Sequence, residues 1–304
     1  FQAEDGIRDC LLSRGLGDVY KRQIVNKIHS SPYKLTIVSS GGGTNAISAL
    51  LKVPGASNTI LESYIPYSKE SMDSFLNKKP DHYCSLETCL SMAANAFKKS
   101  KQIDNESKSK YLIGVAITAN LATTYEKKGE HKFFIVIQAY NYTKHLECYL
   151  DKGKRTREEE EELITGCVIS LLANSCGFDF DLPSINEEII IDQVDAEKPW
   201  EKLFNNKVGY ISNNKNNPEL IFPGSFNPLH EGHIKMKELA EKKTGMHTTF
   251  EICAKNADKP PLTFYEIKKT IDTKIVDLII YFVHHNKFTQ SQSKDDLSRS
   301  FKPN

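Results

Sequence analysis

The segment from Leu220 to His233, LIFPGSFNPLHEGH, constrains the fold of this chain more than any other part of the sequence. It begins with a short apolar run that is typical of the end of a buried strand. Proline, glycine and serine follow, and such residues let the backbone approach a ligand closely. We expect a helix from Gly232 to Ala240 that ends near Gly245, because apolar residues recur there at helical spacing. A strand, a tight turn and a helix in this order predict a phosphate site, since the N–H groups and dipole of a helix N-terminus favour anions.

Two histidines, His230 and His233, lie three positions apart at the start of this helix. Imidazole N–H groups at that place would add donors aimed at the same anion. The alternative is that both are ordinary surface or core histidines, which is the usual role of a lone histidine. Their position inside one compact motif favours the binding role.

A second segment supports the phosphate site. Thr248–Ala254 predicts another strand, and Lys255–Pro261 predicts a polar loop at its carboxyl end. Ligands of open α/β sheets bind outside the carboxyl ends of the strands. Asn256, Asp258 and Lys259 would therefore meet the phosphate or ribose of a nucleotide. Taken alone, such a loop is more often a solvated turn, and its place after the histidine motif is what favours binding.

At these residues the chain resembles the nucleotidylyltransferase superfamily, whose signature is G-x-F-x-P-x-H-x-G-H. The matching residues are Gly224, Phe226, Pro228, His230, Gly232 and His233. The variant GSFNP is most similar to adenylyltransferases that act on nicotinamide mononucleotide, and NADKPP resembles a loop of cytidylyltransferase-like proteins. The resemblance implies a Rossmann-like C-terminal domain in which His230 and His233 are catalytic. It also implies the following nucleotide-binding residues: Gly224, Ser225, Phe226, Asn227, Asn256 and Lys259.

The activity that this resemblance implies is transfer of a nucleotidyl group from a nucleoside triphosphate, ATP in the first place, to a phosphate-bearing acceptor such as nicotinamide mononucleotide. Pyrophosphate is released, and Mg²⁺ accompanies the triphosphate. No metal-binding residues of the protein are expected. One alternative is a catalytically incompetent nucleotide-binding or scaffold protein. Another is a nicotinamide-nucleotide amidase.

The N-terminal half predicts an α/β domain with a largely buried sheet, because strands and helices alternate along it. The expected elements are a strand running into a glycine-rich turn over Lys34–Thr44, a helix over Ser85–Lys99, strands over Tyr111–Ile117 and Phe133–Tyr140, and an amphipathic helix with a capping box at Thr156. The acidic run from Glu158 to Glu162 is expected to be the solvated first turn of that last helix.

Three short segments of this half resemble the C-terminal domain of CinA, the nicotinamide-nucleotide amidase family. They are Ser39–Gly43, Val53–Ser57 and Pro66–Ser68, and the resemblance spans residues 34–177. It implies that Ser39 corresponds to the serine nucleophile of the family.

The chain departs from the amidase pattern at three places. Val38 replaces the glutamate of the family, Met72 the expected lysine, and Ala116–Asn120 the glycine-rich turn. A serine hydroxyl is a weak nucleophile without a neighbouring base. We therefore expect this domain to have lost amidase chemistry and to bind a ligand, to dimerise or to support its neighbour.

The predicted division of the chain is a CinA-like domain over residues 24–180, a linker over 181–218, a partial nucleotidylyltransferase domain over 219–285 and a disordered tail over 286–304. Residues 1–23 resemble the conceptual translation of a sequencing-library adapter, and the fold prediction leaves them out. Only 71 residues follow His233, without a recognisable second phosphate-binding segment. The sequence therefore predicts a truncated transferase domain. The one tryptophan, Trp200, is expected to dock the linker onto a core.

Composition limits the partners. Lysines and arginines number 40 against 39 acidic residues, which argues against a nucleic-acid or membrane surface and for small-molecule nucleotides. The seven cysteines form no C-x-x-C pair, as expected for reduced thiols in a cytoplasmic protein. The apolar run Leu278–Val283 is shorter than the roughly 20 residues of a membrane-spanning helix. The sequence leaves homo-oligomerisation open.

Overall fold

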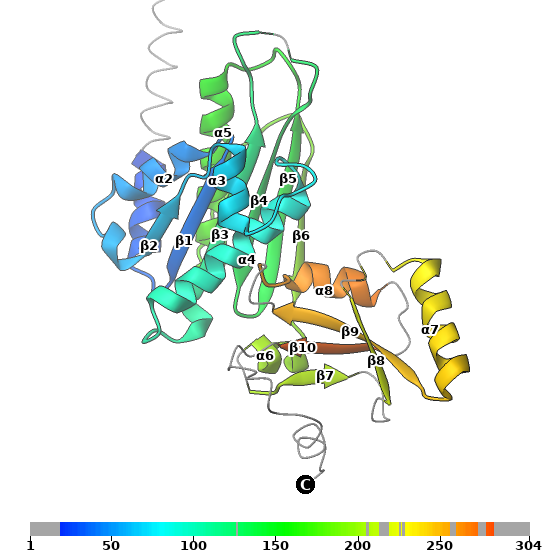
Figure 1. The fold of residues 1–304 in the computed structure, drawn as a ribbon. Helices are drawn as coiled ribbons and strands as arrows, with labels where there is room; N and C mark the ends of the chain where they lie inside the picture. Colours follow the sequence, from blue (N-terminus) through cyan, green and yellow to red (C-terminus); the bar gives the residue numbers. More distant parts are fainter. Residues whose placement is uncertain are drawn as a thin grey trace, which may run out of the picture.

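The computed structural model describes residues 19–125, 127–204, 207–212, 219–224, 226, 229–255, 260–272 and 278–282. These residues form a mixed α/β structure with two sheets (Figure 1). The larger sheet has six strands in the order β2-β1-β3-β4-β5-β6, and the smaller has four in the order β7-β10-β9-β8.

The six-stranded sheet is parallel on one side and antiparallel on the other. Its strands are β1 (Lys34–Ser40), β2 (Ile60–Tyr64), β3 (Leu112–Asn120), β4 (His131–Ala139), β5 (Tyr142–Leu150) and β6 (Ile189–Asp195). β1 is parallel to β2 and β3, whereas β3 to β6 pair antiparallel. The predicted α/β character is confirmed, and the sheet is mixed.

Helices cover both faces of this sheet. A helix over residues 19–29, α2 (Thr44–Leu51) and α5 (Arg157–Ser175) lie on one face, and α3 (Lys69–Leu76) and α4 (Leu86–Ile103) on the other. Short 3-10 helices cover Ala56–Asn58 and Ser109–Tyr111. The side chains of β1 alternate accordingly, so that Leu35 and Ile37 pack towards α2 and α5, and Val38 towards α4.

The start of α5 differs from the prediction in one respect. The capping box between Thr156 and Glu159 is confirmed. The expected solvation of the acidic run is wrong for Glu160, which is fully buried, and for Glu161, which is 9% exposed. Residues three and four apart share a helix face, so Glu160 lies on the same face as Leu163 and must be buried with it.

The smaller sheet contains the histidine motif. Its elements are β7 (Tyr210–Ser212), β8 (Leu220–Gly224), α7 (Glu231–Thr244), β9 (Thr248–Lys255), α8 (Phe264–Ile271) and β10 (Leu278–Phe282). β9 is parallel to its two neighbours, β8 and β10, and β7 is antiparallel to β10. α7 connects two parallel strands, as the sequence predicts, and Gly245 ends it at a φ of 69°.

The described residues of the predicted linker over residues 181–218 instead form two strands and a helix. They contribute β6 to the larger sheet and α6 (Lys198–Phe204) to the core of the smaller one. Trp200 is 5% exposed and stacks on Phe264 with 6.3 Å between ring centroids, which confirms that it docks this segment onto a core.

The two sheets are joined through α8, which lies beside β5 and β6 in Figure 1. The backbone N–H of Phe264 donates to Oγ1 of Thr143 on β5 at 3.0 Å. Next to this bond the rings of His145 and Tyr265 meet edge to face at 5.0 Å. Val194 of β6 belongs to the same core as Phe264, so the apolar contacts continue from one sheet to the other. None of the helices in the described part of the chain is long and apolar enough to cross a membrane.

Candidate functional site

The turn after β8 is shaped by Phe226. This residue adopts a φ of 43°, which is uncommon for a residue with a side chain, and is 2% exposed. Its ring packs against Phe250 at 4.7 Å between centroids and against Phe222 at 5.5 Å. A Cβ atom at Gly224 would lie 2.5 Å from this ring. The sequence therefore needs glycine at 224 for packing, and the apolar core holds the turn in place.

His230 and His233 form the cap of α7. His230 is the N-cap residue, and its Nδ1 accepts the backbone N–H of Gly232 at 3.1 Å. The Nδ1 of His233 accepts the backbone N–H of His230 at 3.3 Å. A Cβ at position 232 would come within 3.0 Å of the His230 ring, so glycine there permits the cap.

These two bonds fix the tautomers of both rings. A neutral imidazole whose Nδ1 accepts a hydrogen bond carries its proton on Nε2. His230 and His233 therefore each present an Nε2–H donor in addition to the N–H groups of the first helical turn. This set of donors suits an anion.

The rings of His230 and His233 stack at 3.7 Å between centroids. The pKa of His233 lies below its ordinary value, because desolvation disfavours the imidazolium and because the charge of His230 repels it. An anion bound at the Nε2 atoms would oppose both effects.

The structure brings together the part of the predicted site that lies on the β8–α7 turn, namely Gly224, Phe226, Gly232 and the two histidines. Five predicted binding residues lie outside the described residues: Ser225, Asn227, Asn256, Asp258 and Lys259. Among the described residues, no group of three or more histidine, cysteine, aspartate or glutamate side chains could hold a metal ion.

The glycine-rich loop after β1 forms a second candidate region. Ser39 is fully buried, and its hydroxyl donates to the carbonyl of Gly42 at 2.6 Å. Ser40 is half-buried and donates to the carbonyl of Pro66 at 3.0 Å. Ser40, rather than Ser39, lines a pocket of about 330 Å³, which Tyr67 and Lys69 also line.

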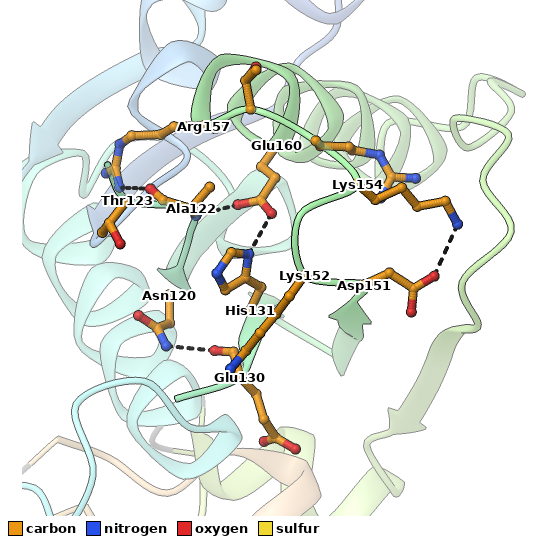
Figure 2. A network of polar contacts seen from close by, with 12 residues as sticks. Asn120, Ala122, Thr123, Glu130, His131, Asp151, Lys152, Lys154, Arg157 and Glu160 are labelled. Carbon is orange, nitrogen blue, oxygen red and sulfur yellow. Dashed lines mark hydrogen bonds and ion pairs between the residues drawn. The ribbon is translucent and has the colours of Figure 1, made fainter. Parts of the chain in front are cut away.

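Two glutamates whose positions in an acidic run predict solvation hold this region together. Glu160 accepts the backbone N–H of Ala122 at 2.6 Å and the Nδ1–H of His131 at 2.8 Å (Figure 2). Glu161 accepts the backbone N–H of Gly43 at 2.8 Å. The helical spacing of both from the apolar residues of α5 is the signal that would have found them.

Comparison with known proteins gives similarity to solved structures alone. No known family model matches the sequence. No curated protein matches it either. Among solved structures, the chain is similar to the competence/damage inducible protein CihA from Agrobacterium tumefaciens, with 17% identity and a TM-score of 0.38 over 53% of this chain and 91% of that one. It is also similar to a competence-damaged protein (CinA) superfamily protein from Klebsiella pneumoniae, with 12% identity and a TM-score of 0.41 over 52% of this chain and 98% of that one. A competence or damage-inducible protein from Enterobacter asburiae is similar with 16% identity and a TM-score of 0.40, over 50% of this chain and 98% of that one.

Proposed function

We propose that the chain is a nucleotidylyltransferase that binds the phosphates of a nucleoside triphosphate, ATP in the first place, at the β8–α7 turn. The acceptor would be a phosphate-bearing molecule such as nicotinamide mononucleotide. The observation that carries the proposal is the pair of Nε2–H donors on His230 and His233 at the N-terminus of α7. The signature from Gly224 to His233 supports this reaction class, because it matches the nucleotidylyltransferase pattern.

The reaction needs positioning and charge stabilisation more than covalent help. A phosphate oxygen of the acceptor attacks the α-phosphorus, the bond to the bridging oxygen breaks, and pyrophosphate leaves with that electron pair. His230 and His233 would donate to the phosphate oxygens on which negative charge increases. Mg²⁺ bound to the triphosphate would neutralise further charge. The donors at the turn suit phosphate oxygens, so the metal would be held by the triphosphate rather than by this turn.

The test separates the role of His230 as the N-cap of α7 from its role as a donor to phosphate. Asparagine is a good N-cap residue, so His230→Asn should keep α7 folded while it removes the Nε2–H donor. We expect pyrophosphate release from ATP plus nicotinamide mononucleotide to fall about 100-fold in this variant, as for the loss of one donor to a developing anion. His247→Gln, near the other end of α7, is the matched control and should keep the wild-type rate.

Undiminished pyrophosphate release in both His230→Asn and His233→Asn would contradict the proposal. Binding of ATP without turnover in the wild-type chain would instead identify a nucleotide-binding or scaffold protein, and calorimetric titration with ATP measures this.

A second candidate is amidase activity in the part of the chain that contains the six-stranded sheet. One observation favours it, because Ser40, Tyr67 and Lys69 line the same pocket. Ammonia release from nicotinamide mononucleotide would then disappear in Ser40→Ala. If ammonia release disappeared in Ser39→Ala and not in Ser40→Ala, the buried Ser39 would be the nucleophile. If the wild-type chain released no ammonia, the amidase candidate would be excluded.

A further inference from the structure

A buried histidine lies at the contact between the two sheets. His145 of β5 is 3% exposed, and its ring meets the ring of Tyr265 on α8 edge to face at 5.0 Å between centroids. Thr143 lies two positions earlier on the same face of β5 and accepts the backbone N–H of Phe264 at 3.0 Å. His145 is therefore part of the surface on which α8 docks, and α8 joins the smaller sheet to the larger one (Figure 1).

His145 differs from the other buried histidines in its hydrogen bonding. Its Nδ1 is buried and has no hydrogen-bond partner in the described part of the chain. In that same part, the two other buried histidines are paired: both ring nitrogens of His29 are hydrogen-bonded, and Nδ1 of His131 is bonded to Glu160. An imidazolium carries an N–H on each ring nitrogen, so a proton on His145 would place an unpaired, buried N–H at this contact.

Two carboxylates lie near His145 on its own face of the sheet. Asp192 is its direct neighbour on β6, and Glu147 follows two positions later on β5. Asp192 is exposed and Glu147 is half-buried, so water screens their charges. Neither forms an ion pair with His145 among the described residues.

The other elements packed around His145 bring no group that would neutralise a proton there. Its neighbour on β4 is the uncharged Val136. α8 contributes the neutral ring of Tyr265 and the carboxylate of Glu266, which is engaged with the backbone N–H and hydroxyl of Thr263. Glu87 of α4 acts on Tyr265 and Glu266.

Burial therefore decides the charge of this ring. The pKa of His145 lies below its ordinary value, because burial disfavours the imidazolium more than the charges of Asp192 and Glu147 favour it. If α8 separated from β5, the ring would meet water, where a histidine has a pKa of about 6.5.

We propose that His145 is a pH-sensitive switch at the contact between the sheets: its neutral ring keeps α8 docked on β5 and β6, and its protonation releases α8 together with the smaller sheet. The separated form takes up the proton at a higher pH than the docked form. Docking is therefore fully stable above about pH 6.5 and weakens as the pH falls below that value. The switch involves neither histidine of α7 and is independent of the proposed transferase.

The test follows hydrogen–deuterium exchange at the backbone N–H of Phe264 in the full chain, because this group is bonded across the contact. His145→Phe keeps a ring against Tyr265 and cannot be protonated. The exchange rate of the wild type is divided by that of the variant at the same pH, which cancels the intrinsic pH dependence of exchange. Relative to its value at pH 7.5, we expect this ratio to rise at pH 5.5 by up to about tenfold, the limit for one proton over one pH unit below 6.5.

Two controls separate docking from other effects of acid. The amide of Ile135, in the middle of the buried strand β4, reports on opening of the larger sheet itself, and its ratio should not change with pH. His82 is exposed, so His82→Gln should keep the pH dependence of the wild type at Phe264. His145→Gln is a second variant without a titratable ring and should behave as His145→Phe; it replaces that variant if the latter does not fold.

The proposal is overturned if the wild type and the two His145 variants share one pH dependence at Phe264. It is also overturned if exchange at Ile135 accelerates as much as exchange at Phe264, because the proton would then unfold the larger sheet instead of releasing α8. The same pH dependence in His82→Gln as in the His145 variants would assign the effect to surface charge and overturn it as well.

Discussion

Glu160 is a fully buried carboxylate, and its removal should be costly. Glu160→Ala would leave the N–H of Ala122 and the ring of His131 without their acceptor, so we expect the free energy of unfolding to fall by about 3 kcal/mol. Glu160→Gln keeps one acceptor and should cost less. Urea denaturation measures both. The exposed Glu158 of the same helical turn is the control, and Glu158→Ala should change stability by less than about 0.5 kcal/mol. Equal costs at positions 158 and 160 would contradict the assignment.

The ion pair between Arg155 and Glu187 should make stability depend on pH. Hydrogen bonds from Arg155 lower the pKa of Glu187 to about 2. Because the pKa is depressed in the folded state, the pair stabilises the fold fully above the ordinary glutamate pKa of about 4.3, and this contribution disappears as the pH falls towards about 2. We expect Glu187→Gln to be less stable than wild type at pH 6 and to approach it near pH 2. Denaturation curves across this range check the prediction, and parallel pH profiles would contradict it.

The spacing of residues in the sequence predicted the histidine turn at the start of α7 but missed the buried glutamates of α5. His230, Gly232 and His233 are near neighbours in sequence, so their common turn follows from spacing alone. Glu160 and Glu161 contact Ala122 and Gly43, which lie 38 and 118 residues away in the chain. A run of glutamates is polar on average, and only these distant backbone partners make its burial favourable.

Among the elements, α4 and β3 pack unusually closely at Gly114. A Cβ atom there would lie 2.2 Å from the backbone nitrogen of Phe97 and 2.3 Å from the backbone oxygen of Ala93. Gly114→Ala should push α4 off the sheet and lower the free energy of unfolding by about 3 kcal/mol. Gly209→Ala is the matched control, because no heavy atom lies within 4 Å of its added Cβ. Chemical denaturation of both variants compares them, and equal stabilities would show that the helix adjusts without cost.

The elements that the sequence predicted share a clear apolar pattern. β3 and β4 are buried along almost their whole length and read as strands from composition. β5 was missed because polar residues, Thr143 and His145, occupy buried positions and hide its alternation. α4 also extends beyond the predicted end at Lys99 to Ile103, since Ser100 is buried against β1 and β3 through hydrogen bonds to Thr36 and Ile113. Such contacts are tertiary, and local propensity does not contain them.

In the whole molecule, the contact between α8 and β5 should couple the unfolding of the two sheets. Thr143 donates to Gln138 at 2.7 Å and accepts the N–H of Phe264 at 3.0 Å. Thr143→Val would remove the hydrogen bonds to Oε1 of Gln138 and from the N–H of Phe264, and should cost about 2 kcal/mol. Trp200, the only tryptophan, reports on the smaller core by fluorescence, while far-UV circular dichroism reports on both sheets. We expect coincident transitions in the wild-type chain and an earlier fluorescence transition in the variant. Coincident transitions in both would show that the contact carries no coupling.

The division of the chain was the least predictable feature. Residues 189–195 carry two aspartates and precede a turn-forming stretch, which is typical of a linker. Their strand exists because it pairs with β5, from Tyr142 to Cys148, and the paired residues are 41 to 53 positions apart in the chain.

β6 also determines where the chain can be divided into fragments. It completes the larger sheet, and its Val194 lies in the core of the smaller one. A gene fragment that stopped at residue 180 would leave β5 as a bare edge strand, and exposed edges promote aggregation. A fragment meant to carry the six-stranded sheet by itself therefore has to include β6.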